Sequence, residues 1–329
     1  MESGGRPESP PATQLTDFRV ARFRLTCRAR TALCLPEYKG ATLRGGFGYV
    51  FRRIACLGSE RGSGDCLLGE QCVYHYIFET PPPSGSVVLD KVPTAPHPFV
   101  IEPPLETKQL YEPGEQLIFH LVLIGRALDY LAYFIYAFDE LGRVGFGKGR
   151  GTYTLETVEW LDATGTAVPL YENGRRVLKG SFSPLTIADL LLPAPRSFLT
   201  LRFLTPTRLK FENHLSRECE FHLLFRNLSR RLGMLGYFHC GEEFPPEQRE
   251  FIERARAIEA QDSNLHWVDW ERYSTRQRTT MRLGGIVGQV TFRGDYSEFL
   301  PYLLLGTYTH VGKGTTFGLG QYEIVMNQP

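Results

Sequence analysis

The sequence lacks any apolar run long enough to span a membrane. Its longest uninterrupted apolar stretch, residues 130–138, has nine residues, whereas a membrane-spanning helix needs about 20. Residues 1–16 are rich in Pro, Gly and Ser and contain no apolar segment typical of secretory signals. We therefore expect a soluble, cytoplasmic protein with no membrane partner, a disordered leader at residues 1–16, and seven cysteines that form no disulfide framework.

The sequence also lacks the motifs of a nucleotide-hydrolysing enzyme. Its glycine-rich stretches do not have the spacing Gly-x-x-x-x-Gly-Lys-Ser/Thr, and the last of them leads into a strand-like run at residues 322–326 instead of a helix. No acidic pair with metal-ligand character accompanies these stretches. A nucleotide-dependent enzyme is therefore disfavoured.

An excess of charge of one sign is absent too, since the formal net charge is +1. The charges are nevertheless unevenly placed along the chain. Residues 19–53 contain nine basic residues and the single acid Glu37, and residues 272–294 contain five arginines and no acid. Local basic surfaces of this kind are the electrostatic feature by which proteins bind nucleic acid.

Two glycine-rich stretches have a similar composition. Residues 310–323 (the second glycine loop) hold Gly312, Gly314, Gly318 and Gly320 around one lysine and two threonines, and residues 142–153 (the first glycine loop) repeat the pattern. Glycines let the backbone approach an anion closely while amides and a lysine point at it. The alternative is a pair of tight turns. Because each stretch follows an apolar helix-like segment, the chain is predicted to consist of two related halves.

The order of predicted elements indicates an α+β fold. A strand at 22–30, a helix at 38–57, a strand at 115–125 and a helix at 127–138 are followed, in the second half, by a strand at 198–210, a helix at 218–235, strands within 265–293 and a helix after Ser297. This order is typical of two tandem ferredoxin-like (RRM-like, βαββαβ) domains. We predict an N-terminal domain at 17–160 with a cysteine-containing insertion, a linker at 161–196, and a C-terminal domain at 197–329.

The first predicted strand and the first predicted helix both present basic residues. Residues 22–30 alternate apolar side chains with four arginines, which indicates either a solvated face or a face near something anionic. In the helix, Arg44, Tyr49, Arg52 and Arg53 lie off the apolar stripe. Three glycines in this helix, at positions 45, 46 and 48, each lower helix propensity by about 1 kcal/mol relative to Ala. They require either close packing on a sheet or close approach of a ligand.

A cluster of cysteines and one histidine lies in the predicted insertion. Cys56, Cys66, Cys72 and His75 are of the residue types that hold structural zinc. The first two lack the close pairing of a zinc knuckle, so buried thiols and a hydrogen-bonded histidine are the alternative.

Five segments resemble a known family when taken in order. They are Leu43-Arg-Gly-Gly-Phe-Gly48, Cys72-Val-Tyr-His-Tyr-Ile-Phe-Glu79, Phe203-Leu-Thr-Pro-Thr-Arg-Leu-Lys210, Tyr273-Ser-Thr-Arg-Gln277 with Gly284-Gly285, and the glycines at 312–320. They resemble the CRISPR precursor-RNA-processing endoribonucleases of the RAMP superfamily. The resemblance implies two ferredoxin-like domains that bind CRISPR repeat RNA, or the guide RNA made from it, and other CRISPR effector subunits.

The resemblance also implies cleavage that requires no cofactor, in which the RNA 2′-hydroxyl attacks the adjacent phosphate and leaves a 2′,3′-cyclic phosphate. Many relatives have a histidine in the first helix where this sequence has Tyr49. Histidine titrates near neutrality, and a tyrosine can still orient the hydroxyl or donate a proton. We expect Lys39 and Arg44 to stabilise the phosphorane, Tyr38 to supply a second hydroxyl, and His310 to act as a replacement acid or base or to fix its loop by hydrogen bonding.

RNA contacts are expected from basic side chains and from the second glycine loop. The candidates are Arg52, Arg53, Lys148, Arg150, Arg230, Arg231, Arg276, Arg278, Gly312, Lys313, Gly314, Thr315, Gly318 and Gly320. The alternative to an endoribonuclease is a non-catalytic subunit of the same fold that holds the end of a guide RNA in an effector complex.

Overall fold

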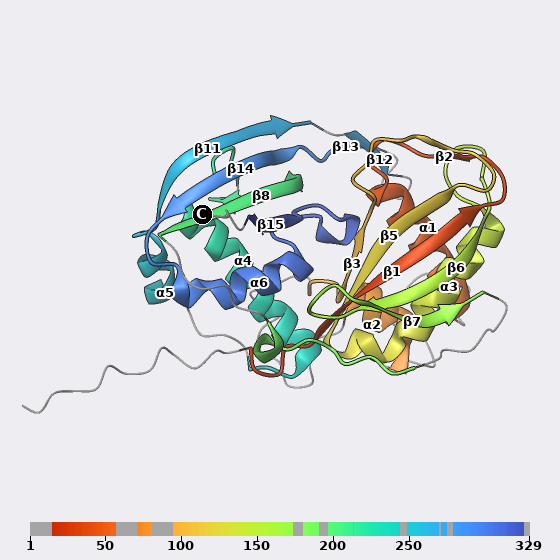
Figure 1. Ribbon diagram of the computed structural model, residues 1–329, viewed down its shortest axis with the longest axis horizontal. Helices are drawn as coiled ribbons and strands as arrows, with labels where there is room; N and C mark the ends of the chain where they lie inside the picture. Colours follow the sequence, from red (N-terminus) through yellow and green to blue (C-terminus); the bar gives the residue numbers. More distant parts are fainter. Residues whose placement is uncertain are drawn as a thin grey trace, which may run out of the picture.

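The computed structural model describes residues 15–56, 71–80, 95–173, 180–190, 197–212, 214–243, 249–269, 271–274 and 279–325. Two large antiparallel sheets lie side by side, each with helices on one face (Figure 1). The N-terminal half occupies the right of the view and the C-terminal half the left. In the described part of the chain, no helix is both long and apolar enough to cross a membrane.

The N-terminal half has the ferredoxin-like strand order. Its sheet runs β3-β5-β1-β6-β7, with every neighbouring pair antiparallel. The elements are β1 (Val20–Ala29), β2 (Leu33–Cys34), α1 (Gly40–Ala55), α2 (Val73–Glu79), β3 (Phe99–Glu102), β4 (Leu110–Tyr111), β5 (Gln116–Ile124), α3 (Leu131–Val144), β6 (Tyr153–Leu161) and β7 (Ala167–Glu172). Strand β7 lies inside the segment predicted as a linker and extends this sheet.

The C-terminal half repeats the same arrangement. Its sheet runs β11-β14-β8-β15, and α4 and α6 cover one face of it (Figure 1). The elements are β8 (Phe198–Thr207), β9 (Lys210–Phe211), β10 (His214–Leu215), α4 (Phe221–Leu235), α5 (Arg249–Ala255), β11 (Glu259–Val268), β12 (Glu271–Ser274), β13 (Thr279–Arg282), β14 (Gly285–Arg293), α6 (Leu300–Thr309) and β15 (Tyr322–Val325). The prediction of two tandem ferredoxin-like units is thus confirmed.

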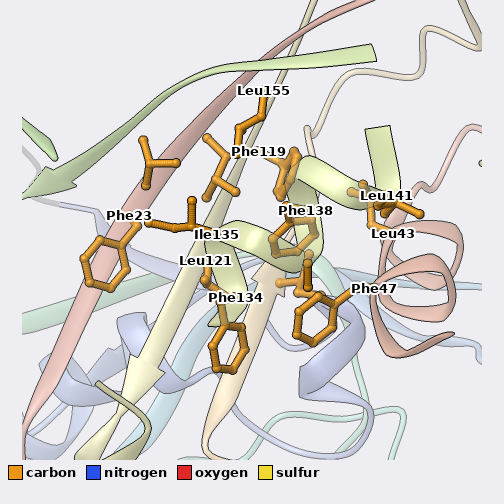
Figure 2. Packing of buried hydrophobic residues seen from close by; sticks show 14 of the residues in the cluster. Phe23, Leu43, Phe47, Phe119, Leu121, Phe134, Ile135, Phe138, Leu141 and Leu155 are labelled. Atoms are coloured by element: carbon orange, nitrogen blue, oxygen red, sulfur yellow. The ribbon is translucent and has the colours of Figure 1, made fainter. Parts of the chain in front are cut away.

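Helices α1 and α3 pack on the N-terminal sheet through a core of aromatic rings. Phe47 of α1 stacks on Phe134 and Phe138 of α3, with ring centroids 5.1 and 4.9 Å apart, and all three rings are buried (Figure 2). Such rings remove large apolar areas from water and pack in defined geometries. The apolar stripe predicted in the first helix is therefore its core face, while Tyr49, Arg52 and Arg53, which lie off the stripe, are exposed.

The basic face of β1 is neutralised by the protein itself. Arg24 contacts Glu159 of β6 at 2.8 Å, Arg28 forms an ion pair with Glu156 of the same strand, and Arg22 contacts Glu102 of β3 at 2.9 Å. The anionic neighbours anticipated from the sequence are carboxylates on adjacent strands, which the antiparallel pairing brings opposite the arginines. This face of the sheet is therefore not a free cationic surface.

The two halves meet at the second glycine loop. The short 3-10 helix η7 (Thr315–Phe317) inside this loop contacts α1 and β3 of the N-terminal half. Gly318 has a φ of 81° and lies so close to Pro103 and to the Ile101 carbonyl that a side chain would collide with both. The glycines of this loop thus allow close packing between the two halves.

Candidate functional site

A groove of about 1490 Å³ lies in the N-terminal half, between α1 and the first glycine loop. Its walls come from three places in the sequence, namely helix α1, the loop after α3, and the paired segments at β2 and β4. The lining residues are Cys34, Leu35, Pro36, Ala41, Thr42, Gly45, Gly46, Tyr49, Arg53, Gln109, Leu110, Leu141, Val144, Gly145, Phe146, Gly147, Lys148 and Arg150. Four of the predicted site residues, Tyr49, Arg53, Lys148 and Arg150, come together here.

Helix α1 supplies the first wall from residues off its apolar stripe. Tyr49 is 57% exposed, and the Arg53 guanidinium lies 5.6 Å from the centre of its ring, one helical turn further on. Two glycines of this helix have different surroundings, which give different reasons for the lack of a side chain. Gly45 has no neighbouring atoms beyond its own helix and opens the groove, whereas Gly46 packs against Leu141 of α3. Close packing, one of the two explanations anticipated from the sequence, therefore applies to Gly46, although its neighbour is a helix and not a sheet, and approach of a ligand at Gly45 stays a prediction.

The first glycine loop supplies the opposite wall. Gly145, Gly147 and Gly149 all have positive φ values, of 73°, 74° and 81°. The Lys148 amide donates to the Cys34 carbonyl at 3.0 Å, which ties the loop to β2. Arg150 also has a positive φ, of 51°, although it is not a glycine. Such a backbone conformation is strained for an arginine, and strained residues concentrate at functional sites.

The paired segments at β2 and β4 form the third part of the groove, which the sequence analysis missed. The Leu35 amide donates to the Gln109 carbonyl at 2.8 Å, and Cys34 pairs with Leu110. Strands of two residues leave no periodic pattern in a sequence. The one signal in the sequence was a large apolar residue, Leu110, within a polar stretch. In the structure its side chain is 44% exposed.

The groove is electropositive. Its lining residues include the cations Arg53, Lys148 and Arg150 and no carboxylate. Cations on two facing walls favour an extended anion that runs between them. A tyrosine hydroxyl among these cations can donate or accept a hydrogen bond at such an anion. In the part of the chain that the structure describes, no histidine lines this groove.

Lys39 is not part of the groove. It is fully buried at the start of α1, where its ammonium group donates to the Glu106 carbonyl at 2.7 Å and to the Glu37 carbonyl at 3.1 Å. Burial lowers the pKa of Lys39, and the nearby Glu106 and Glu37 counteract this in part. Lys39 therefore joins the segment before α1 to the segment before β4, and a direct role at a phosphorane does not fit its burial.

Tyr38 and Arg44 lie at the contact between the two halves around the second glycine loop, which we call the seam. The Tyr38 hydroxyl donates to the Phe317 carbonyl at 2.7 Å, and burial raises the pKa of the Tyr38 phenol well above its ordinary value. The Arg44 guanidinium lies over the ring of Phe78 at 4.6 Å and at 6.0 Å from the ring of Phe317. Both side chains thus connect α1 to the second glycine loop, and neither lines the groove.

His310 is enclosed by the same seam. It is fully buried, and its two ring nitrogens lie 3.1 Å from the Leu319 carbonyl and 3.0 Å from the Glu102 carboxylate. Burial alone would raise the pKa of Glu102, but Arg22 and the hydrogen bond from His310 lower it to about 2. Of the two roles considered from the sequence, this geometry favours the fixing of the loop over acid or base catalysis.

The remaining predicted RNA contacts lie outside the groove. In the second glycine loop, Thr315 is buried and Lys313 is exposed, while Gly312 pairs with Arg208 and Gly320 with Val311 and Pro206. Gly314 and Gly318 flank η7. Arg230 is exposed on α4, and Arg231 donates to the Thr309 carbonyl at 2.9 Å, with burial lowering its pKa to about 9. Arg52 is exposed beside Tyr74, whereas Arg276 and Arg278 lie outside the described residues.

The predicted zinc ligands are only partly described, because Cys66 lies outside the described residues. Cys56 and Cys72 flank α1 and α2, and His75 contacts Glu79 at 3.0 Å on the next turn of α2. Within the described ranges, no three His, Cys, Asp or Glu side chains are grouped closely enough to hold a metal ion.

Comparison with protein families assigns both halves of the chain. A family model described as an N-terminal domain matches residues 18–182. A second family model, described as CRISPR-associated endoribonuclease Cas6, matches residues 201–322. Through its C-terminal half the chain belongs to the Cas6 family. The resemblance to the CRISPR RNA-processing endoribonucleases of the RAMP superfamily is thus confirmed.

Individual proteins are also similar to this chain. An uncharacterized protein of Archaeoglobus fulgidus is 24% identical over 297 residues, which cover 88% of this chain and 92% of that protein. The structure of a Cas6 product complex aligns with a TM-score of 0.56 at 17% identity, covering 93% of this chain and 99% of that one. A partial Cas6-RT-Cas1–Cas2 complex aligns with a TM-score of 0.58 at 16% identity, covering 95% of this chain and 47% of that one. At these identities the two structures show that the fold is shared.

Proposed function

We propose that this protein cleaves CRISPR repeat RNA in the groove, without a metal ion, through attack of an RNA 2′-hydroxyl on the adjacent phosphate. The products are a 2′,3′-cyclic phosphate and a free 5′-hydroxyl. One observation carries the proposal. The groove brings Tyr49 together with Arg53, Lys148 and Arg150 on two facing walls, and none of the described residues that line it has a carboxylate.

The roles of these residues follow from their positions. Lys148 and Arg150 on the glycine loop, with Arg53 on α1, hold the phosphates on either side of the reacting bond and neutralise the charge of the phosphorane. The Tyr49 hydroxyl either orients the attacking 2′-hydroxyl, whose proton passes to water, or donates a proton to the leaving 5′-oxygen and regains one from water. Because these groups supply positioning, proton transfer and charge stabilisation, the chemistry requires no cofactor.

A second candidate function has one observation in its favour, which is that no histidine is found among the described residues that line the groove. Imidazole titrates near neutrality and is the most common acid or base in such reactions. A Cas6-type protein without it could hold the guide RNA and leave cleavage to another active centre. The groove and its cations would then serve binding alone.

Partners are proposed on the same basis. We expect this protein to act on CRISPR repeat RNA in the cytoplasm and to bind other CRISPR subunits. One of the solved structures that share the fold is a Cas6 in a complex with RT, Cas1 and Cas2. Co-purification of the tagged protein with CRISPR RNA and with its neighbouring CRISPR subunits tests this expectation.

The two candidate functions are separated by single-turnover incubation with labelled repeat RNA in EDTA. Specific cleavage that leaves a 2′,3′-cyclic phosphate supports the endoribonuclease. Tight binding without cleavage supports the RNA-holding subunit. Absence of both binding and cleavage would contradict each of them.

A further inference from the structure

Two large side chains in the groove remain exposed although they are mostly apolar. Leu110 is 44% exposed and the ring-bearing Tyr49 is 57% exposed, while Pro36 nearby is exposed as well. Phosphate binding explains the cations of the groove but requires none of this apolar surface. A ligand that covers it must therefore have a flat or apolar part as well as negative charge.

The exposure of Leu110 is fixed by the backbone around it. Leu110 pairs with Cys34, and the neighbouring Gln109 carbonyl accepts the Leu35 amide at 2.8 Å. Four residues before Leu110, the Glu106 carbonyl accepts the buried ammonium of Lys39 at 2.7 Å. These backbone contacts hold the segment that contains Leu110 in the groove wall, where its side chain lies outside the core.

The dimensions and charges of the groove match an oligonucleotide. Its volume of about 1490 Å³ exceeds the roughly 300–1,000 Å³ that is typical for one small ligand. Cations lie on the α1 wall and on the glycine-loop wall, and apolar surface lies on the wall formed at β2 and β4. Single-stranded RNA presents both kinds of surface at once, because its phosphates are charged and its unstacked bases have flat apolar faces.

We infer that Leu110 and the ring of Tyr49 form a nucleobase subsite, which takes one unpaired base of the RNA while Arg53, Lys148 and Arg150 hold the neighbouring phosphates. This inference rests on the proposed function, since it places a base in the same groove. A base that remains paired within a duplex keeps its faces stacked on its neighbours and cannot cover Leu110. The substrate is therefore unpaired at the nucleotide that binds here.

The test is a double-mutant cycle between one side chain and one base. Leu110→Ala is compared with Leu105→Ala, because Leu105 is 55% exposed in the same segment but does not line the groove. Each variant is titrated with repeat RNA and with a series of repeat RNAs that lack one base at a time. We expect Leu110→Ala to weaken binding of the intact RNA about 5- to 10-fold, at the low end of losses from removed stacking, and Leu105→Ala to change it less than 2-fold.

The double-mutant cycle should show coupling to Leu110 at only one nucleotide of the RNA. At that position the missing base should cost wild type the same 5- to 10-fold, and Leu110→Ala should add no further loss, since interacting groups are not additive. Pairing that nucleotide with a complementary strand should have the same effect. Equal affinities of the two leucine variants, or losses that multiply at every position, would overturn the subsite.

Failure of the subsite can be told apart from failure of the proposed function. If neutralising Lys148 and Arg150 weakens RNA binding while Leu110→Ala does not, the groove still binds RNA and only the subsite is rejected. If neutralising these cations leaves RNA binding unchanged, the groove itself is rejected and the subsite with it. Thermal melting of each variant verifies folding, which the exposure of Leu110 should leave intact.

Discussion

Neutralising the glycine-loop cations of the groove should weaken RNA binding in a manner that depends on salt. In the double variant Lys148→Gln with Arg150→Gln, two of the three groove cations are lost, and both side chains are exposed. Each phosphate contact made by a cation to single-stranded nucleic acid contributes about −0.7 to the slope of log affinity against log salt. The slope should therefore become shallower by about 1.4.

This change in slope can be converted into affinities. Between 50 and 200 mM KCl the salt concentration rises about fourfold, so the ratio of variant to wild-type Kd should shrink about sevenfold over that range. The measurement is fluorescence anisotropy of labelled repeat RNA at four salt concentrations. A 2′-deoxy nucleotide at the cleavage position of the RNA prevents turnover during the titration.

The matched control removes the same charge elsewhere. Arg254→Gln with Arg256→Gln changes one arginine of α5 and one directly after it, which form surface ion pairs with Glu298 and Glu253, far from the groove in the other half. Such exposed pairs contribute little to stability. The control should keep the wild-type slope to within about 0.3. Equal slopes for wild type and the groove variant would refute the assignment of RNA to the groove.

Three further predictions concern strain and buried charge. Arg150→Gly relieves the positive φ and should leave the Tm unchanged or raised while RNA affinity falls, and a lower Tm would contradict the strain argument. Glu102→Gln removes the buried charge that faces Arg22 and His310, and should lower the free energy of unfolding in urea by about 3 kcal/mol or more; a loss below about 1 kcal/mol would reject its role at the seam. Burial lowers the pKa of His97 to about 4, so the stability it contributes is complete above its ordinary pKa of about 6.5 and is lost as the pH falls from about 6.5 to about 4. Urea titrations at pH 7, 5.5 and 4.5 should show this loss and show less of it in His97→Phe, and identical pH profiles of the two proteins would exclude His97 as its source.

Local patterns in the sequence were sufficient for the fold. Alternation in residues 22–30 predicted β1, and the apolar stripe through Leu43 and Phe47 predicted both α1 and its buried face. The order of such elements then limited the topology to a ferredoxin-like arrangement. Each of these signals depends on residues that are close together in the chain, so a single sequence is enough to detect them.

The site was only partly predictable, because its geometry depends on residues distant in sequence. Tyr49 was predicted from the sequence as a catalytic residue and Lys148 and Arg150 as RNA contacts, and the fold brings all three to one groove. No pattern in the sequence placed Leu110 beside them. Lys39 was predicted to stabilise a phosphorane, but its ammonium group is bound by backbone carbonyls. One of these carbonyls belongs to Glu106, which lies 67 residues away in the sequence. Burial of this kind is a tertiary effect that composition and periodicity do not reveal.

The second glycine loop illustrates the same limit. Its composition indicated contact with an anion, yet Gly318 serves the contact with Pro103 across the seam. Glycine permits close approach of any backbone, and the sequence alone does not distinguish a ligand from another part of the same protein. The first glycine loop has the same composition, and there the glycines shape a wall of the groove with Lys148 and Arg150 exposed beside them.

The central claim is that Tyr49 takes part in the chemical step in the groove, and one pair of variants tests it most directly. Tyr49→Phe removes only a hydroxyl, and Tyr136→Phe removes the same group from a tyrosine of α3 that is 53% exposed and does not line the groove. The measurement is the single-turnover rate with saturating repeat RNA in EDTA, together with the Kd of each variant. Tyr49→Phe should slow cleavage by about 100-fold or more with nearly unchanged RNA affinity, in line with the loss of an acid or base group, and Tyr136→Phe should cut at the wild-type rate. Cleavage by Tyr49→Phe at the wild-type rate would contradict the claim.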